Sequence, residues 1–194
     1  GAGTLYFFDG NHQVNTTSYD VGSTYIGQTY SAANVYFNAS NVALNYLFIY
    51  SGVLGGPATK LLKDDLVFIS GQLTGGSIEN TDTSVCYFGA GNPGLGAINT
   101  SFTNNGVVEV SPYYGGCCTE PVINMSGGSF TNNGTFNVTG SGGIRYVGLS
   151  NGTFINNAGG VINSNVGDVS FGEPSFRMQP SIFTNLGTIN VLRN

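Results

Sequence analysis

The chain has 194 residues, of which 40% are hydrophobic and only 8% are charged, and its formal net charge is −5. Ordinary globular domains carry about 25% charged residues, so solubility must come from Asn, Ser, Thr or groups attached to them. Disorder is excluded, because apolar residues are frequent and alternate with period two. Phosphate binding needs clustered Lys and Arg. Nucleic acid is therefore not an expected partner, since the basic residues are only Lys60, Lys63, Arg145, Arg177 and Arg193.

The N-terminal segment, residues 1–65, is predicted to be a β segment. Turn-forming residues separate its apolar runs, and the spacing of these runs does not show the Phe-Thr-Asn-Asn-Gly motif found further along the chain. The segment therefore forms either degenerate early rungs of a repeat fold or a separate β cap. Its β-prone runs are 4–8, 23–30, 33–37 and 42–50.

Two features inside this segment limit its interpretation. The run 42–50 is too short to cross a bilayer, so no membrane span is expected. Residues 51–65 contain Gly-Gly-Pro and both lysines. This composition predicts a crossover loop or lid, in which 58–65 could form one helical turn.

From residue 66 to 194 one motif recurs, and its most complete copy is Ser-Phe-Thr-Asn-Asn-Gly-Thr-Phe-Asn-Val at 129–138. The leading apolar residue falls at Ile78, Phe102, Phe130, Phe154 and Phe183, in steps of 24, 28, 24 and 29 residues. A repeat of 20 to 50 residues is typical of a solenoid.

Aligning the copies predicts which side chains share a place in each rung. Alternate residues of a strand point to opposite faces, so one set of apolar positions should form stacked core columns. At the following bend, Asn tolerates left-handed geometry and its amide can bond its counterpart one rung away, while Gly permits a tight turn. The predicted core is Phe102, Phe130, Phe136, Val138, Phe154, Ile162, Phe183 and Ile189, and the predicted corner ladder is Asn104, Asn132, Asn156 and Asn185.

Rungs of 24–29 residues suit three strands with variable corners. We therefore expect an all-β fold, a parallel β-helix with irregular rungs, right-handed by the crossover rule. The Phe-Thr-Asn-Asn-Gly motif resembles the repeats of large secreted β-solenoid surface proteins, the adhesin-like and haemagglutinin-like group. That resemblance covers residues 66–194 and implies a stalk, an adhesin or a fibre subunit.

Seven Asn-x-Ser/Thr sequons predict N-linked glycans on a chain with little charge. Composition alone would give about four. Asn137 is expected to face outward, and Asn99 and Asn151 both lie three residues before a leading Phe. The sequons are Asn15, Asn38, Asn99, Asn124, Asn133, Asn137 and Asn151.

Three cysteines allow at most one disulfide within the chain. A bridge from Cys86 to Cys117 or Cys118 is the preferred prediction for a secreted protein, with the remaining thiol free to pair with another subunit. Free buried thiols are the alternative. No zinc-ligand spacing is present, so no metal or cofactor is expected.

No catalytic pattern is recognised, and the protein is predicted not to be an enzyme. Asp64 and Asp65 are adjacent, but neighbouring strand residues face opposite ways, and His12 is the only histidine. A polysaccharide-binding or polysaccharide-cleaving β-helix, or an adhesin module, is the alternative. Ice binding through Thr103, Thr131 and Thr184 is disfavoured by the variable rung lengths.

The ends of the repeat favour assembly. Residues 189–194 lie inside a repeat copy and no polar cap is visible, although terminal rungs expose an apolar core and unpaired peptide groups. The sequence is therefore expected to be a fragment, or its end is covered by the next subunit. The predicted function is an extracellular or cell-surface structural glycoprotein that self-associates head to tail through its solenoid ends or N-terminal strand.

Overall fold

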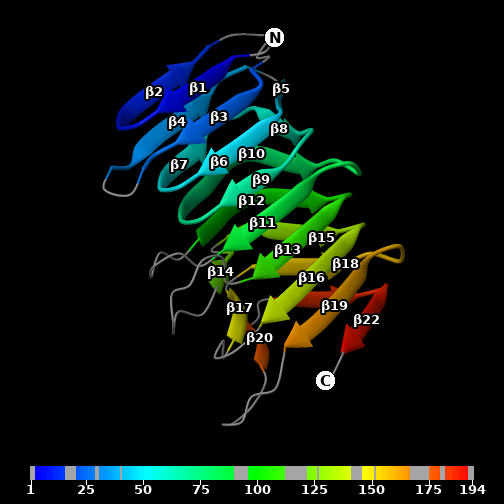
Figure 1. Cartoon of the computed structure of the whole chain (residues 1–194). Coiled ribbons are helices and arrows are strands. Elements are labelled where there is room, and N and C mark those ends of the chain that lie inside the picture. Colours follow the sequence, from blue (N-terminus) through cyan, green and yellow to red (C-terminus); the bar gives the residue numbers. More distant parts are fainter. Residues whose placement is uncertain are drawn as a thin grey trace.

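The protein is a β-solenoid built from parallel sheets, seen in a computed structural model. The structure describes residues 3–15, 21–28, 31–39, 41–89, 96–111, 122–125, 127–140, 146–150, 152–166, 175–179 and 182–191. All pairings between strands in this part are parallel, and no helix occurs in it (Figure 1).

One face is a nine-stranded sheet that runs the length of the solenoid. Figure 1 shows its strands stacked in chain order from the N-terminal to the C-terminal end. They are β1 (Thr4–Phe7), β3 (Ser23–Ile26), β6 (Tyr46–Ile49), β9 (Leu66–Phe68), β11 (Val85–Gly89), β13 (Val107–Ser111), β16 (Thr135–Gly140), β19 (Val161–Val166) and β22 (Thr188–Val191).

A thirteen-stranded sheet forms the other two faces. Its main path is β2 (Gly10–Val14), β4 (Ala33–Phe37), β7 (Gly52–Gly55), β10 (Gly71–Asn80), β12 (Gly96–Asn104), β14 (Val122–Asn124), β17 (Tyr146–Ser150) and β20 (Ser175–Gln179). The remaining strands are β5 (Asn41–Leu44), β8 (Thr59–Leu62), β15 (Ser129–Asn132), β18 (Thr153–Asn156) and β21 (Ile182–Asn185).

The long strands β10 and β12 join these two faces. The first half of β10 pairs with β7 and the second half pairs with β8. The register between β10 and β12 shifts between Thr74 and Ser77, where Gly75 and Gly76 both have positive φ. Glycine adopts this conformation without steric cost, so the pair lets one continuous strand turn the corner.

The N-terminal strands belong to the same sheets as the repeat region. β1, β3 and β6 continue the nine-stranded sheet, and β2, β4 and β5 continue the thirteen-stranded one. Residues 51–65, where the sequence predicted a crossover loop, instead hold β7 and β8. The prediction was wrong because it relied on the composition of the segment, Gly-Gly-Pro and two lysines, whereas Lys60 occupies an inward strand position.

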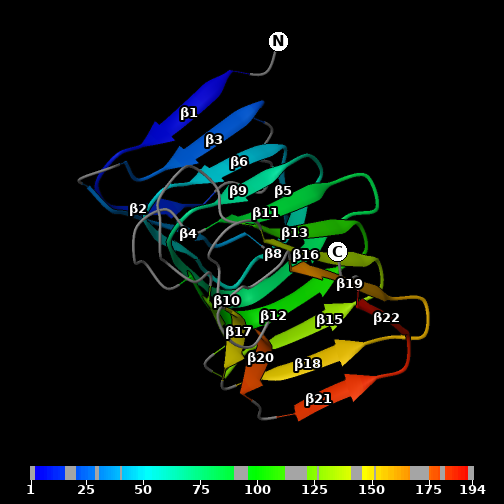
Figure 2. The same cartoon turned by 60° about the horizontal axis from the view of Figure 1, so that its bottom comes forward.

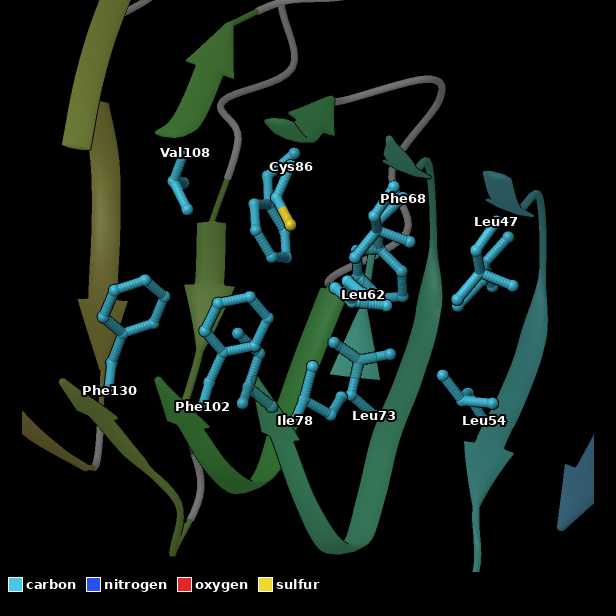
Figure 3. Packing of buried hydrophobic residues seen from close by; sticks show 14 of the residues in the cluster. Leu47, Leu54, Leu62, Phe68, Leu73, Ile78, Cys86, Phe102, Val108 and Phe130 are labelled. Carbon is cyan, nitrogen blue, oxygen red and sulfur yellow. The ribbon is translucent and has the colours of Figure 1, made fainter. Parts of the chain in front are cut away.

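The core fills the space between the sheets with one layer of side chains per rung (Figure 3). Phe102, Phe130 and Phe154 stack with ring centroids 4.9 and 5.1 Å apart, and Phe136 meets Phe130 edge-on at 5.4 Å. Such offset and edge-to-face pairs stabilise beyond simple burial. The predicted core residues Phe102, Phe130, Phe136, Val138, Phe154 and Ile162 are all buried.

The last rung differs from this pattern. Phe183 stacks on Phe154 at 5.8 Å and Ile189 pairs in register with Ile162, so both lie in the predicted columns. Nevertheless Phe183 is 37% and Ile189 42% exposed. The prediction that they are core residues is corrected, because β21 and β22 are edge strands with no described strand beyond them.

Candidate functional site

A row of asparagines runs along the thirteen-stranded sheet, at the C-terminal ends of β10, β12, β15, β18 and β21. Each donates from Nδ2 to the Oδ1 of its counterpart in the next rung, at 2.7 Å from Asn80 to Asn104, 2.7 Å from Asn104 to Asn132, 2.8 Å from Asn132 to Asn156, and 2.7 Å from Asn156 to Asn185. The first four are fully buried. Hydrogen bonds gain strength in such surroundings and polarise one another, so this inner ladder ties five rungs together.

The ladder positions differ from the sequence prediction in two respects. The asparagines end strands β10, β12, β15, β18 and β21 and face inward, and Asn80, in the degenerate copy, is an additional member. The following glycines are needed for close approach rather than for left-handed geometry, because a Cβ on Gly134 would lie 2.2 Å from the carbonyl oxygen of Gly106.

The inner ladder has a direction and therefore two unlike ends. At its N-terminal end, Oδ1 of Asn80 is buried without a partner, because its register neighbour on β8 is Leu62. At its C-terminal end, Nδ2 of Asn185 donates to the carbonyl of Gly187 at 3.3 Å. The C-terminal edge thus presents a side-chain donor at the position where a further rung would continue the ladder.

Two outer ladders run in the opposite direction and end on carboxylates. Asn157 donates to Asn133, Asn133 to Asn105, and Asn105 to Oε1 of Glu79, at 2.6, 2.8 and 3.0 Å. In the second ladder, Asn190 donates to Asn163, Asn163 to Asn137, and Asn137 to Oε1 of Glu109, at 2.8, 2.8 and 2.6 Å. A hydrogen bond to an ionised acceptor is about twice as strong as a neutral one, so Glu79 and Glu109 anchor their ladders.

The sequons fall in different surroundings. Asn15, Asn38, Asn99 and Asn133 are exposed and Asn137 is half-buried, while the side chain of Asn124 and the whole of Asn151 lie outside the described residues. Asn133 and Asn137 are members of the outer ladders, where Nδ2 donates to the neighbouring rung. A glycan is attached to this same nitrogen, so a sugar there would disturb the ladder.

We expect Asn99 to carry more glycan than Asn133 or Asn137 when the chain is made in a host that performs N-glycosylation. Asn99 is exposed on β12, and no outer-ladder bond uses its side chain. Glycopeptide mass spectrometry gives the occupancy of each sequon. Equal occupancy at the three positions would show that the ladders do not select among them.

Cys86 is a buried free thiol on β11, beneath the nine-stranded sheet. The predicted bridge from this residue to Cys117 or Cys118 is therefore corrected in favour of the alternative, a free buried thiol, and the two other cysteines lie outside the described residues. Burial, followed by the negative charge of Asp65, raises the pKa of Cys86 well above its ordinary value. The thiol is therefore kept protonated and unreactive.

Lys60 is the most unusual buried group, because it projects from β8 into the core and is completely inaccessible to solvent. Its three ammonium protons are directed at three backbone carbonyls, with Nζ 2.9 Å from Gly56 O, 3.1 Å from Ala58 O and 3.0 Å from Gly75 O. Burial disfavours the charged form and lowers the pKa of Lys60 to about 8.

The sequence interpretation missed this residue, although one signal was available. Lys60 pairs in register with Val42 on one side and Ile78 on the other. It therefore occupies the same column as Phe102 and Phe130. Thr59 and Ser77 are 18 residues apart. A repeat step of 18 residues, in place of the 24 or more found later in the chain, would have aligned Lys60 with Ile78.

The acidic residues that the structure describes do not gather into a site. Asp64 is exposed and Asp65 half-buried, while Glu79 and Glu109 accept the ladder bonds described above. Among the described residues, no three His, Cys, Asp or Glu side chains lie together where they could hold a metal ion. In the same part of the chain, no helix has the length and apolar character needed to cross a membrane.

The two ends of the solenoid carry the exposed apolar surface. Every large apolar side chain that the structure describes as exposed lies either at the first strand or in the last rung. Figure 2 shows β1 and β21 at opposite ends of the molecule. These side chains are Tyr6 and Phe8 at the N-terminal end, and Ile182, Phe183, Leu186, Ile189 and Val191 at the C-terminal end.

Comparison of the chain with models of protein families, with curated proteins and with solved structures found no match. The functional argument for this β-solenoid therefore rests on its own geometry.

Proposed function

We propose that this chain is a non-enzymatic structural glycoprotein of the cell exterior, a subunit of a fibre or surface layer that assembles head to tail. The observation that carries the proposal is that, in the part of the chain that the structure describes, the exposed large apolar side chains are confined to the two solenoid ends. Contiguous exposed apolar surface marks interaction sites, and a contact between unlike ends propagates as a filament.

The remaining surface supports a structural role. The two outer ladders run along the surface of the solenoid. Their amide side chains form hydrogen bonds between neighbouring rungs and so stabilise the stack. The acidic side chains Glu79 and Glu109 are engaged in this cohesion and not grouped for acid–base chemistry. The exposed sequons Asn15, Asn38, Asn99 and Asn133 are candidate positions for solubilising sugars. A resemblance of the repeats to secreted β-solenoid surface proteins agrees with this assignment.

A polysaccharide-binding domain is the second candidate, favoured by aromatic rings on the outer face of the nine-stranded sheet. Tyr6 stacks on Tyr25 at 4.9 Å with a 20° angle between the rings, and Tyr25 lies 5.7 Å from Phe48. Sugar rings bind to free aromatic faces, whereas rings stacked in this way cover one another. The arrangement therefore supports assembly better than sugar binding.

We expect the purified chain to form filaments or higher oligomers as its concentration rises. Exposed apolar ends lose contact with water when they meet, which favours association by about 25 cal/mol per Å² of apolar surface buried. Negative-stain imaging and light scattering over a wide concentration range measure the outcome. A chain that stays monomeric at high concentration, with its far-UV circular dichroism showing a folded β protein, would refute the proposal.

A further inference from the structure

The nine-stranded sheet has two different edge strands, β1 at one end and β22 at the other. The β22 edge of one copy could therefore extend the sheet by pairing with the β1 edge of another. Among the described strands, β1 pairs only with β3, and β22 pairs only with β19. All strands of this sheet run in the same direction, so β22 of one copy followed by β1 of the next preserves the parallel order. Figure 1 shows β1 and β22 at opposite ends of the nine-stranded sheet.

Free peptide groups are present on both edges. Alternate residues of a strand direct their N–H and C=O groups to opposite sides. The N–H of Thr188 donates to Gly160 O at 2.9 Å, so Ile189 and Val191 direct theirs to the open side. Phe7 O accepts from the N–H of Gly27 at 2.8 Å, so Thr4 and Tyr6 face outward at the other edge.

The side chains of the two edges also correspond. β22 has the sequence Thr-Ile-Asn-Val and β1 has Thr-Leu-Tyr-Phe. Ile189 is in register with buried Ile162, and Phe7 is in register with buried Ile26, so both strands alternate in the same phase. Setting Thr188 beside Thr4 places Ile189 on Leu5 and Val191 on Phe7, which continues the core columns across the junction.

The strands β1 and β22 lack the residues that usually protect an edge against strand addition. Natural proteins commonly prevent another strand from pairing with an edge strand by placing Lys, Pro, inward-pointing charges or bulges in it. β1 and β22 contain no charged residue and no proline. Val191 is 71% and Tyr6 52% exposed, so the two edges combine unpaired peptide groups with apolar side chains.

We propose that β22 of one copy pairs in parallel with β1 of the next copy, with Thr188 beside Thr4, so that the nine-stranded sheet continues through the filament. This inference rests on the proposed function and names its contact. A closed two-fold dimer through two β22 strands is the competing arrangement. It would pair two β22 strands in antiparallel fashion, whereas the described pairings within this sheet are all parallel.

The test uses one proline variant at each edge. Tyr6→Pro removes an N–H from the open side of β1, and Val191→Pro removes one from the open side of β22, so neither deletes a bond within the chain. Tyr6→Val and Val191→Thr are the matched controls, since they keep the N–H and suit a strand. Circular dichroism and thermal unfolding check that each variant folds.

The expected result is that each proline variant alone stays monomeric, while an equimolar mixture of the two forms a dimer and stops there. Each control should assemble like the wild type. Native mass spectrometry and light scattering distinguish these species. In the mixture, the intact β22 edge of one variant meets the intact β1 edge of the other, and the two remaining edges are blocked.

Other outcomes separate the failure of this contact from the failure of the proposed function. Dimers of Tyr6→Pro alone would establish the two-fold arrangement and overturn the head-to-tail pairing. Normal filaments from both proline variants would place the contact elsewhere and leave the proposed function standing. A wild-type chain that remains monomeric would overturn both.

Discussion

Replacing Asn132 by Leu is expected to lower the free energy of unfolding by about 3 kcal/mol, because it interrupts the inner ladder at its centre. Asn132 accepts from Asn104 Nδ2 at 2.7 Å and donates to Asn156 Oδ1 at 2.8 Å. Leucine has a similar shape but supplies neither bond. The Oδ1 of Asn156 would then be buried without its donor, and each such unpaired polar atom costs about 1–3 kcal/mol.

The matched control is Asn133→Leu, one residue further along the same strand end. Asn133 belongs to an outer ladder and its side chain is exposed, so water replaces the lost partners and the cost should stay below about 1 kcal/mol. Urea unfolding gives both values, and the Asn132 variant should melt roughly 6–12 °C lower than the wild type. Equal losses for the two variants would show that burial does not strengthen the inner ladder.

The repeat region could be predicted because two independent patterns agree there. The alternation of apolar residues selects an inward face, and the recurrent Phe-Thr-Asn-Asn-Gly motif fixes the register, so that Phe102, Phe130 and Phe154 fall into one stacked column. Asn104, Asn132 and Asn156 occupy one offset, and the structure links them through their amides. Both features are set by local sequence and by the repeat.

The N-terminal rungs could not be recognised because their spacing and core chemistry differ. Asn41 pairs with Thr59, which pairs with Ser77, and the latter two are 18 residues apart. The step between the asparagines of the following rungs, from Asn80 to Asn104, is 24 residues. The column position taken by Phe102 is held here by Val42 and Lys60, and a lysine gives no apolar signal. Only the 18-residue step marks the place of Lys60 in the sequence, because the pattern of apolar residues does not include a lysine.

The cysteine prediction failed for a related reason. The bridge was predicted on the expectation of a secreted protein, but Cys86 lies in the interior with Leu66 beside it in the neighbouring strand. In this position the sulfur acts as a small apolar side chain. The exposure of Phe183 and Ile189 likewise depends on whether another strand covers them, a property that no local pattern contains.

Raising the pH from about 8 toward about 10.5 is expected to stabilise the wild-type chain relative to a Lys60→Met variant. The folded-state pKa of Lys60 is lowered to about 8 from an ordinary 10.5. Between these values the unfolded chain binds a proton that the folded chain has released, so the free energy of unfolding increases with pH. The relative gain should be on the order of 2 kcal/mol over this interval.

The comparison between variants is needed because other groups also titrate in this pH range, and their titration lowers the free energy of unfolding as the pH rises. Burial, followed by the charge of Asp65, raises the pKa of Cys86, and burial with the charges of Asp65 and Glu109 raises that of Tyr87. A raised pKa in these acids means that stability falls as pH rises through it. Both groups are present in the wild type and the variant, so their effects cancel in the difference.

Lys63→Met is the matched control, because Lys63 follows β8 directly and its side chain is exposed. Its stability curve should run parallel to that of the wild type across the alkaline range, whereas the curve of Lys60→Met should diverge. Urea unfolding at several pH values measures all three curves. If Lys60→Met also runs parallel to the wild type, the Lys60 ammonium keeps its proton throughout. The three carbonyls of Gly56, Ala58 and Gly75 would then compensate fully for its burial.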